Sequence, residues 1–425
     1  MGKAVVTAWH CNVGFLKQKS AKNNREHGLE FLCTGLESQV STPYLVSMSS
    51  LLSAIAVRLA YGATQLPRIA WYVGHGFAMR RLAESARQRA GEVGRRHQPT
   101  NVRVPDRMQI YADMAVLLRQ DLANLEAGLY PLPADHDGSF FNLLQRSRLF
   151  FEDLPEIHRR RERGGHGEVL NEHTVGKRPH YYLQNFHFQS GGWMTDESAK
   201  RYDTQVEVLF NGTANAIRRQ ALPQLREVFA RRDQRKLRLL DIGCGTGRFL
   251  DQVKQVWPRL PCIGLDLSEP YIGYARQHLR RWAVTSFLLA NAEAIPIADA
   301  SCDAVTSIFM FHELPPGVRR TVFRECARVL KPGGRFVLVD SVQRGDRPDY
   351  DGLLDLFPRN YHEPYYSTYI TENFEEIGRA SGLTHLRNFN AFVSKVMVFD
   401  KPGSRASLVP KSSRGPKALG LASLR

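Results

Sequence analysis

Short apolar runs alternate with segments of helical periodicity between residues 236 and 400 of this chain. Continuous apolar runs bounded by polar or glycine-rich stretches are typical of strands that are buried on both faces of a sheet. Because helical segments separate these runs, the pattern predicts an α/β fold with a parallel sheet covered on both sides. The first five predicted strands begin at Leu239, Cys262, Phe287, Asp303 and Arg335, and the last two, Thr384–Phe389 and Phe392–Phe399, form a reversed edge.

An all-helical subdomain with basic connectors is predicted upstream, over residues 48–176. Apolar residues recur at helical spacing in three segments, and the second and third of these begin at plausible N-cap residues. Hydrophilic stretches rich in glycine or arginine separate the helices. The predicted helices are Leu51–Met79, Asp106–Leu129 and Ser139–Phe151, and the predicted connectors are 87–102 and 159–176.

The chain ends and the segment before the sheet differ in composition from these parts. Residues 1–47 lack sustained periodicity and the layout of a signal or transit peptide, which predicts a disordered extension before Met48. Residues 401–425 are rich in Pro, Ser, Gly and Lys, which predicts a disordered basic tail. Residues 177–235 combine an aromatic stretch with a lead-in helix, so the sheet domain itself is predicted to span 236–400.

A glycine-rich turn follows the first predicted strand, with Gly243, Gly245 and Gly247 at alternate positions. Glycine adopts positive φ and lets the backbone approach a ligand, and the following helix directs free N–H groups toward it. The second predicted strand ends in Asp266, where dinucleotide-binding folds place an acid that accepts hydrogen bonds from ribose hydroxyls. A nicotinamide-binding loop has a different glycine spacing, so hydride transfer is the runner-up among cofactor enzymes.

Three further signatures follow in order: Asn291-Ala292-Glu293, Phe311-His312-Glu313 and the turn Leu330–Gly334. With the glycine loop and Asp266, they make the run Leu239–Asp340 resemble the class I S-adenosylmethionine-dependent methyltransferases. Within that class, the chain is similar to the small-molecule "type 11" branch that includes the ubiquinone/menaquinone biosynthesis C-methyltransferases. The resemblance implies a Rossmann-like, seven-stranded methyltransferase sheet and S-adenosyl-L-methionine as the cofactor.

The resemblance also implies roles for individual residues around that cofactor. The loop glycines, with Cys244 between them, would approach its methionine half, and Asp241 would hold its amino group directly or through water. Asp266 would bind the ribose and Leu267 would pack on the adenine. Asn291 stands where the family often has Asp, so it keeps an acceptor for the adenine amino group but loses the charge-assisted component. Ala292 and Glu293 complete this loop, and the alternative is that Asn291 is only a turn residue.

Aromatic residues outside the sheet predict a cap over the cofactor and acceptor. The stretch 181–193 is aromatic and polar together, and the resemblance places such segments above the cofactor, whose sulfonium cation prefers π faces. The alternative is that these side chains only attach the helical subdomain to the core. The cap candidates are His187, Trp193 and Tyr202, and, from a second segment after the fifth strand, Tyr365 and Tyr366.

His312 and Glu313 are the predicted catalytic residues, because they follow the fourth strand at the carboxyl edge where ligands of open α/β sheets bind. An acceptor that is a phenol, hydroxyl or acidic carbon benefits from a general base, which either side chain supplies. His187 and His362 are alternatives, and Glu313 equally suits a cap on the following turn. No Cys/His spacing typical of a metal site is present, so no metal is predicted.

The net charge limits the partners that the sequence predicts, and the cysteines indicate a cellular location. The 425 residues carry a formal net charge of +16, which suits an anionic membrane surface, a nucleic acid or simple solvation. Nucleic acid is the less favoured partner, because no RNA-binding or base-methylation motif accompanies the charge. In the first helical segment Pro67 and two arginines argue against a membrane span, whereas aromatic and basic anchors favour an interfacial helix. The six scattered cysteines indicate reduced thiols and a cytoplasmic location.

The sequence therefore favours methyl transfer to a small, hydrophobic or aromatic acceptor such as a quinone or lipid, with peripheral membrane association as an accompanying hypothesis. Two readings from other classes remain: an RNA or protein methyltransferase that uses the basic surface, and a cofactor-binding protein without catalysis. The identity of the acceptor and the oligomeric state stay open.

Overall fold

The computed structural model describes residues 48–89, 103–135 and 137–403. The predicted extension 1–47, most of the first connector and the tail from residue 404 lie outside the described residues, so the predictions for them stay untested.

The sheet has seven strands in the order β3-β2-β1-β4-β5-β7-β6. Strands β1 to β5 pair in parallel, and β7 is antiparallel to both of its neighbours, which confirms the predicted α/β sheet with a reversed edge. The strand order changes direction between β1 and β4, the point at which open sheets of this type bind ligands. The strands are β1 (Leu239–Ile242), β2 (Cys262–Asp266), β3 (Thr285–Leu289), β4 (Cys302–Ile308), β5 (Leu330–Ser341), β6 (Thr384–Ala391) and β7 (Ser394–Asp400).

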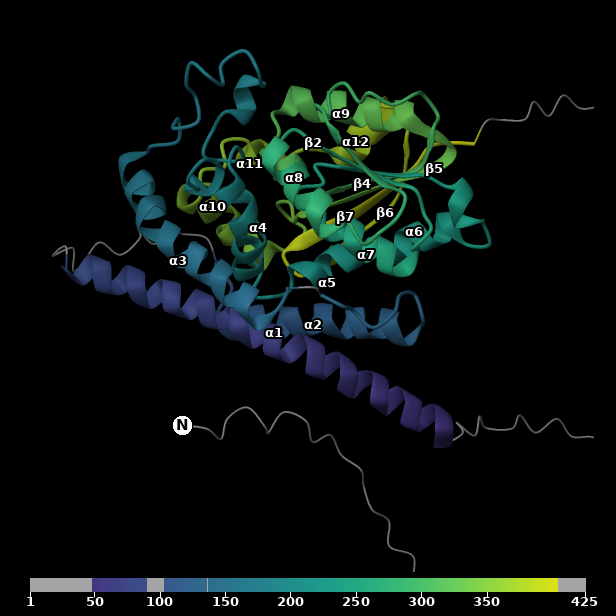
Figure 1. The fold of residues 1–425 in the computed structure, drawn as a ribbon, viewed down its shortest axis with the longest axis horizontal. Coiled ribbons are helices and arrows are strands. Elements are labelled where there is room, and N and C mark those ends of the chain that lie inside the picture. The colour runs from purple at the N-terminus through teal and green to yellow at the C-terminus, as the bar shows by residue number, and fades with distance from the viewer. Residues whose placement is uncertain (1–47, 90–102, 136, 404–425) are drawn as a thin grey trace, which may run out of the picture. The chain divides into compact units, whose positions relative to one another are not determined.

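Helices cover both faces of the sheet (Figure 1). Side-chain alternation along the strands divides the core into two clusters, one on each face of the sheet. Leu239 packs in the first cluster and its neighbour Leu240 in the second, as the two-residue period of a strand requires. The first cluster includes residues of α5 (Ala214–Arg219), α6 (Leu222–Phe229), α7 (Arg248–Val256) and α8 (Glu269–His278), and the second includes residues of α9 (Pro316–Val329), α10 (Asp351–Asn360), α11 (Tyr366–Tyr369) and α12 (Phe374–Ala380).

The N-terminal helices attach to the sheet domain through a buried polar network centred on Asp121 of α2 (Arg107–Glu126). Its carboxylate accepts hydrogen bonds from Tyr61 Oη at 2.7 Å, from Tyr130 Oη at 2.6 Å and from two nitrogens of Arg219. Arg219, on α5, also pairs with Asp135 at 2.7 Å. Because these charges are paired and hydrogen-bonded, the network fixes α2 against α5 without leaving a buried ion uncompensated.

The first helix, α1 (Met48–Arg89), packs against α2 and α4 (Asp196–Leu209). Its Arg68 is buried and forms ion pairs with Glu207 at 2.5 Å and with Asp137 at 2.7 Å. None of the helices in the described part of the chain combines the length and apolarity that crossing a bilayer requires.

Two N-terminal helices run further than their apolar pattern predicts. α1 continues past Met79 to Arg89, and α3 (Phe140–Arg163) continues through Pro155, so the basic run at 159–161 is helical rather than part of a connector. Basic side chains in the last turn stabilise the negative end of the helix dipole, which explains why a polar segment continues α3. Gly164, at φ 65°, then ends the helix in the left-handed conformation.

The segment Leu330–Gly334, predicted as a helix end and turn, belongs to β5 in the structure. Leu330 pairs with Cys302, and the register then shifts so that Arg335 pairs with Ala304, which accommodates the Pro-Gly-Gly residues as an irregularity in the strand. Lys401, placed in the disordered tail by the sequence, donates its backbone N–H to Gly334 O at 2.8 Å. The ordered edge of the sheet therefore reaches one residue further than predicted.

Candidate functional site

A cleft lies at the carboxyl ends of β1 to β4, where the strand order changes direction. This is the position where open α/β sheets bind ligands. The cleft is lined by Tyr181, Tyr182, Phe186, Trp193, Tyr202, Gly243, Gly245, Leu265, Asp266, Leu267, Ser268, Tyr271, Ala290, Asn291, Ala292, Phe309, Met310, Glu313 and Leu314.

The glycine loop forms one wall of the cleft and needs its glycines for two separate reasons. All three adopt positive φ, at 64° for Gly243, 52° for Gly245 and 78° for Gly247. A Cβ on Gly243 would lie 2.6 Å from Met310 Sδ, so this glycine makes room for a neighbouring side chain. Gly247 does not line the cleft but starts α7, and Cys244 packs in the core. The loop's contact with a ligand is therefore made through Gly243 and Gly245.

Asp266 fixes the loop and remains available to a ligand. Its Oδ2 accepts a hydrogen bond from Gly245 N at 2.8 Å, and its Oδ1 accepts one from Ser268 N at 2.9 Å. Burial raises the pKa of this carboxyl, and the backbone N–H donors oppose that shift. Each carboxylate oxygen has more than one acceptor position, so the side chain that organises the loop also has capacity to bind two adjacent hydroxyls.

Asp241 and Glu293, both predicted to contact the cofactor, do not line the cleft. Asp241 is buried beneath the loop, accepts a hydrogen bond from Thr306 Oγ1 at 2.6 Å, and has its pKa raised to about 7 by burial. Glu293 instead supports the lining: its carboxylate accepts hydrogen bonds from Tyr181 Oη at 2.8 Å and from Asn291 Nδ2 at 3.0 Å. The predicted contact of Asp241 with the cofactor, directly or through water, therefore stays a prediction, and the structure places this side chain behind the lining.

Asn291 combines the two roles that the sequence left as alternatives. It lines the cleft, and its Oδ1 accepts a hydrogen bond from Glu293 N at 2.9 Å, which is the geometry of an Asx turn. The side chain therefore shapes the loop while it faces the ligand space.

An aromatic wall covers the glycine loop. Trp193, Tyr202 and Tyr271 pack edge to face, with ring centroids 5.3–5.8 Å apart. The indole Nε1 of Trp193 and the Oη of Tyr182 are buried, and both side chains line the cleft. Glu313 and Ser268, which also line the cleft, are their nearest polar neighbours, so this wall offers polar atoms as well as aromatic faces.

α4 holds this wall in place over the loop. Asp203, one residue after Tyr202, accepts hydrogen bonds from Thr246 Oγ1 at 2.6 Å and from Arg248 Nε at 2.7 Å. The pKa of Asp203 is well below its usual range, because its Arg248 and Thr246 contacts outweigh burial. These bonds join the cap helix directly to the turn that begins α7, so cap and loop move together.

The other predicted cap residues lie outside the cleft lining. Tyr366 is buried in the second core cluster, and its Oη is 2.7 Å from Ser341 Oγ. Tyr365 accepts a hydrogen bond from Gln184 Nε2 at 3.2 Å and packs beside Trp193 and its neighbours. His187 is close to Glu363 instead. The second cap segment therefore supports the wall rather than forming its surface.

Of the two predicted catalytic residues, Glu313 lines the cleft and His312 stands behind it. His312 Nδ1 is 2.6 Å from Asp340 Oδ1, and its Nε2 is 3.9 Å from Glu313 Oε1. Burial alone lowers the pKa of His312, but the Asp340 carboxylate outweighs burial and raises it to about 10. His312 therefore carries a proton at neutral pH, which does not suit the role of a general base that the sequence predicted.

Several lining residues were not singled out from the sequence. Tyr181, Tyr182 and Phe186 belong to the aromatic stretch that was noticed as a whole, so composition gave a regional signal for them. Tyr271 and Met310 had no comparable signal, because they reach the cleft from a helix and from the end of a strand. The others missed are Leu265, Ser268, Ala290, Phe309 and Leu314.

Comparisons with known proteins find methyltransferases that are similar to this chain. The family described as "Methyltransferase domain" matches residues 240–338. A demethylmenaquinone methyltransferase of Thermotoga maritima is 32% identical over 145 residues, or 34% of this chain and 58% of that protein. A demethylmenaquinone methyltransferase of Thermus thermophilus is 31% identical over 185 residues, or 43% of this chain and 78% of that protein. The chain belongs to this methyltransferase family.

Membership of the methyltransferase family implies S-adenosylmethionine as the cofactor. The chain spans about half the length of most of the curated relatives it matches first. Among solved structures, an S-adenosylmethionine-dependent methyltransferase of Aquifex aeolicus is 20% identical, with 42% of this chain and 88% of that chain covered and a TM-score of 0.32. A likeness at that score carries no weight, and the fold assignment rests on the strand order given above.

Proposed function

We propose that this methyltransferase domain binds S-adenosylmethionine in the cleft and transfers its methyl group to a small acceptor. The observation that supports this most is the shared geometry of the glycine loop and Asp266, which places a carboxylate and open backbone on one wall. Tyr182 and Trp193 also line the cleft, and their polar atoms suit the acceptor atoms of such a cofactor. The residues that line the cleft therefore fit S-adenosylmethionine.

Methyl transfer does not require the protein to form a covalent bond with either reactant. Bound S-adenosylmethionine supplies an electrophilic methyl group on a cationic sulfur. The chain aligns the two reactants and excludes water, which is where most of the rate enhancement of such a reaction originates. We assign the cofactor to Gly243, Gly245, Asp266 and Asn291, and water exclusion to the aromatic wall. Glu313 is the lining residue that we place beside the acceptor.

The walls of the cleft support one class of acceptor. Aromatic and aliphatic side chains dominate the lining, and Asp266 and Glu313 are its only carboxylates among the described residues. A flat, largely apolar molecule with a few oxygen atoms suits such a surface. Demethylmenaquinone methyltransferases among the relatives act on a molecule of that kind, which supports a quinone-like or lipid-like acceptor here.

Labelled methyl transfer tests this function. The full-length protein is incubated with methyl-labelled S-adenosylmethionine and, separately, with a membrane lipid extract, total RNA and a protein extract. We expect label in the organic-soluble fraction of the lipid reaction. Label in RNA or protein that disappears steeply with added salt would instead favour the basic-surface alternative, because phosphate contacts weaken with ionic strength.

His312→Ala tests whether this residue positions Glu313. The His312 ring is oriented by its bond to Asp340 and reaches toward Glu313 without touching the cofactor side of the cleft. We expect kcat to fall about tenfold, since a small misplacement of a reacting group has effects of that order, while the Kd for S-adenosylhomocysteine stays within about twofold. An unchanged kcat would show that the pair is purely structural.

We also propose that α1 makes peripheral contact with an anionic membrane surface. Ile55, Leu59, Leu66 and Phe77 are exposed and lie within about 40° of one another on a helical wheel at 100° per residue. Exposed arginines at positions 58, 80 and 81 flank this stripe. An apolar stripe bordered by basic residues is the pattern of interfacial helices, and the net charge of +16 favours anionic lipid.

Co-sedimentation with vesicles tests this contact. The double variant Leu59→Ser and Leu66→Ser is expected to bind vesicles of phosphatidylserine and phosphatidylcholine about fivefold more weakly, because two apolar side chains are lost from the stripe. Leu82→Ser is the control, since Leu82 is also an exposed leucine of α1 but lies on the opposite side of the helix. Equal binding by both variants and the wild type would rule out the stripe.

A further inference from the structure

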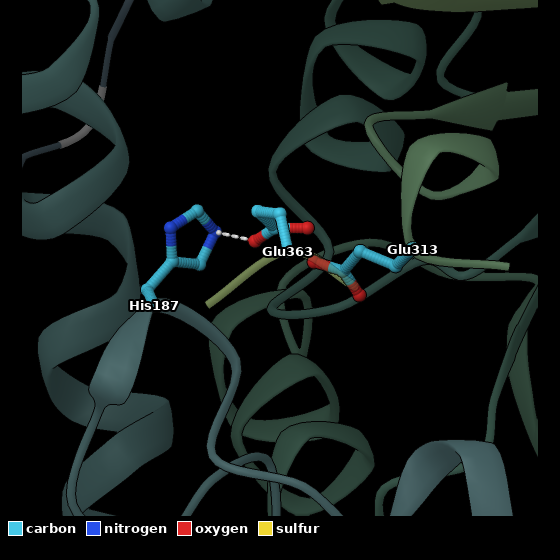
Figure 2. A group of neighbouring side chains, drawn as sticks. All are labelled: His187, Glu313 and Glu363. Atoms are coloured by element: carbon cyan, nitrogen blue, oxygen red, sulfur yellow. Dashed lines mark ion pairs between the residues drawn. The ribbon is translucent and has the colours of Figure 1, made fainter. Parts of the chain in front are cut away.

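A cluster of ionisable side chains lies at the Glu313 side of the cleft. His187 belongs to η2 (Phe186–Phe188), Glu313 to η4 (Phe311–Glu313), and Glu363 to the link between α10 and α11. Figure 2 shows the three side chains extending from separate segments into one region, with Glu363 between the other two. One potential ligand atom from each lies within 4.8 Å of the others, and the described part of the chain contains no other group with this arrangement.

Glu363 is the member that indicates a missing partner. Its side chain is 0% exposed, and neither carboxylate oxygen has a hydrogen-bond partner among the described residues. His187 Nε2 lies 3.2 Å from its Oε1, but the two are not in hydrogen-bond geometry. A buried carboxyl group whose two oxygens have no hydrogen-bond partner is costly in either protonation state. A cation or a donor between the three side chains would satisfy these oxygens.

The neighbouring charged side chains do not hydrogen-bond to these oxygens. His312 is bonded to Asp340 at 2.6 Å and is 3.9 Å from Glu313. Among the described residues, the ion pair of Glu363 is with His187 alone. An imidazole nitrogen and carboxylate oxygens are ordinary metal ligands, so the geometry of the three side chains suits a cation.

We propose that His187, Glu313 and Glu363 bind a divalent first-row metal ion at the acceptor end of the cleft. One imidazole and two carboxylates form a mixed donor set that suits Zn²⁺, Mn²⁺ or Fe²⁺ better than Mg²⁺, which prefers oxygen ligands alone. A cation between the two acids would neutralise both and satisfy the unpartnered oxygens of Glu363. The sequence gave no indication of this site, because its ligands are far apart in the chain.

The position of the site suggests its use. Three protein ligands leave at least one coordination position open, as in catalytic zinc centres. Glu313 lines the cleft, so the open position lies beside the space that we assign to the acceptor. A hydroxyl or carbonyl oxygen of the acceptor is the ligand expected there, and a cation would polarise it. This use rests on the proposed function, whereas metal binding itself does not.

Metal binding is measured on the full-length protein, prepared without a histidine tag and treated with EDTA. We expect calorimetric titration with Zn²⁺ or Mn²⁺ to give one site per chain in the micromolar range or tighter. Glu363→Gln should weaken that site at least tenfold, and His187→Gln should remove the visible absorption bands of the Co²⁺-loaded protein. Glu376→Gln and His173→Ala are the matched controls, because both residues are exposed and far from the cluster in the chain; they should bind like the wild type.

Thermal unfolding confirms that each variant is folded, and if one of the two cluster variants fails to fold, the other decides. No metal site in the wild type, or binding by both variants within twofold of the wild type, would overturn the proposal. Titration with S-adenosylhomocysteine separates the two conclusions: loss of metal binding with intact binding of that ligand leaves the methyltransferase function standing. Metal binding without binding of that ligand would leave the cation site standing and remove its assigned role.

Discussion

Asp266→Ala is expected to weaken the binding of S-adenosylhomocysteine by ten- to a hundredfold. The variant loses a carboxylate that we place against the ribose, and hydrogen bonds to a charged group contribute about 1.5–3 kcal/mol. It also releases Gly245 N, whose hydrogen bond to Asp266 holds the glycine loop in its positive-φ conformation. Both losses act in the same direction, so this single change has the largest expected effect on binding.

Asp299→Ala is the matched control for Asp266→Ala. Asp299 is also a loop carboxylate and pairs with Arg328, but its side chain is 76% exposed and it does not line the cleft. We expect this variant to bind S-adenosylhomocysteine like the wild type, since a surface ion pair contributes little. If calorimetry gave the two variants the same affinity as the wild type, Asp266 would have no place in the binding site.

Gly247→Ala is expected to lower the free energy of unfolding by about 2–4 kcal/mol. The residue has φ 78°, and an alanine there is strained by roughly 1–2 kcal/mol. A Cβ would also overlap Leu279 Cδ1 and lie 3.3 Å from Ala275 Cβ, both in the buried first core cluster, where overpacking costs typically 1–3 kcal/mol. Chemical denaturation monitored by circular dichroism measures the difference.

Gly273→Ala provides the comparison for that substitution. Gly273 is exposed within α8, and a Cβ there would meet no atom within 4 Å. Alanine is the better helix former, so this variant is expected to be as stable as the wild type or more stable by about 0.5–1 kcal/mol. A Gly247→Ala protein as stable as the Gly273→Ala protein would mean that neither strain nor overlap acts at the turn.

The fold was predictable because its central strands β1 and β4 are buried throughout and β5 is buried over most of its length. Leu239, Val305 and Val337 lie in strands that contact helices on both faces, so their continuous apolar runs are visible in the sequence. The loop glycines and Asp266 were predictable for a related reason, since a close backbone approach to a ligand restricts residue type at fixed spacing. The local sequence pattern and the family resemblance therefore predicted the wall of the cleft that we assign to the cofactor.

The acceptor side was not predictable, because long-range contacts decide it. Glu363 lies 176 residues beyond His187 in the numbering, and nothing in the local sequence of either indicates that their side chains meet. The hydrogen-bond partners of Asp241 and His312 were not predictable for the same reason. Thr306 binds the first and Asp340 the second, and both partners come from neighbouring strands. Sequence alone shows the residue types but not which of them pair.

The end of α3 was also not predicted correctly from the sequence. α3 extends to Arg163 through a segment that is polar and contains Pro155. Tertiary contacts explain this extension: Arg160, near its end, donates hydrogen bonds to Phe188 O and Ser190 Oγ of the aromatic stretch. The polar end of α3, which the sequence predicts as a connector, therefore supports the aromatic stretch of the cap.

Calorimetric titration of the full-length protein with S-adenosylmethionine and S-adenosylhomocysteine, with NADH as the control ligand, tests the central claim most directly. The cleft geometry predicts one site per chain, micromolar affinity for both sulfur ligands and no heat from NADH. No binding of either sulfur ligand, or binding of NADH in their place, would contradict the assignment of the glycine loop and Asp266 to an S-adenosylmethionine site.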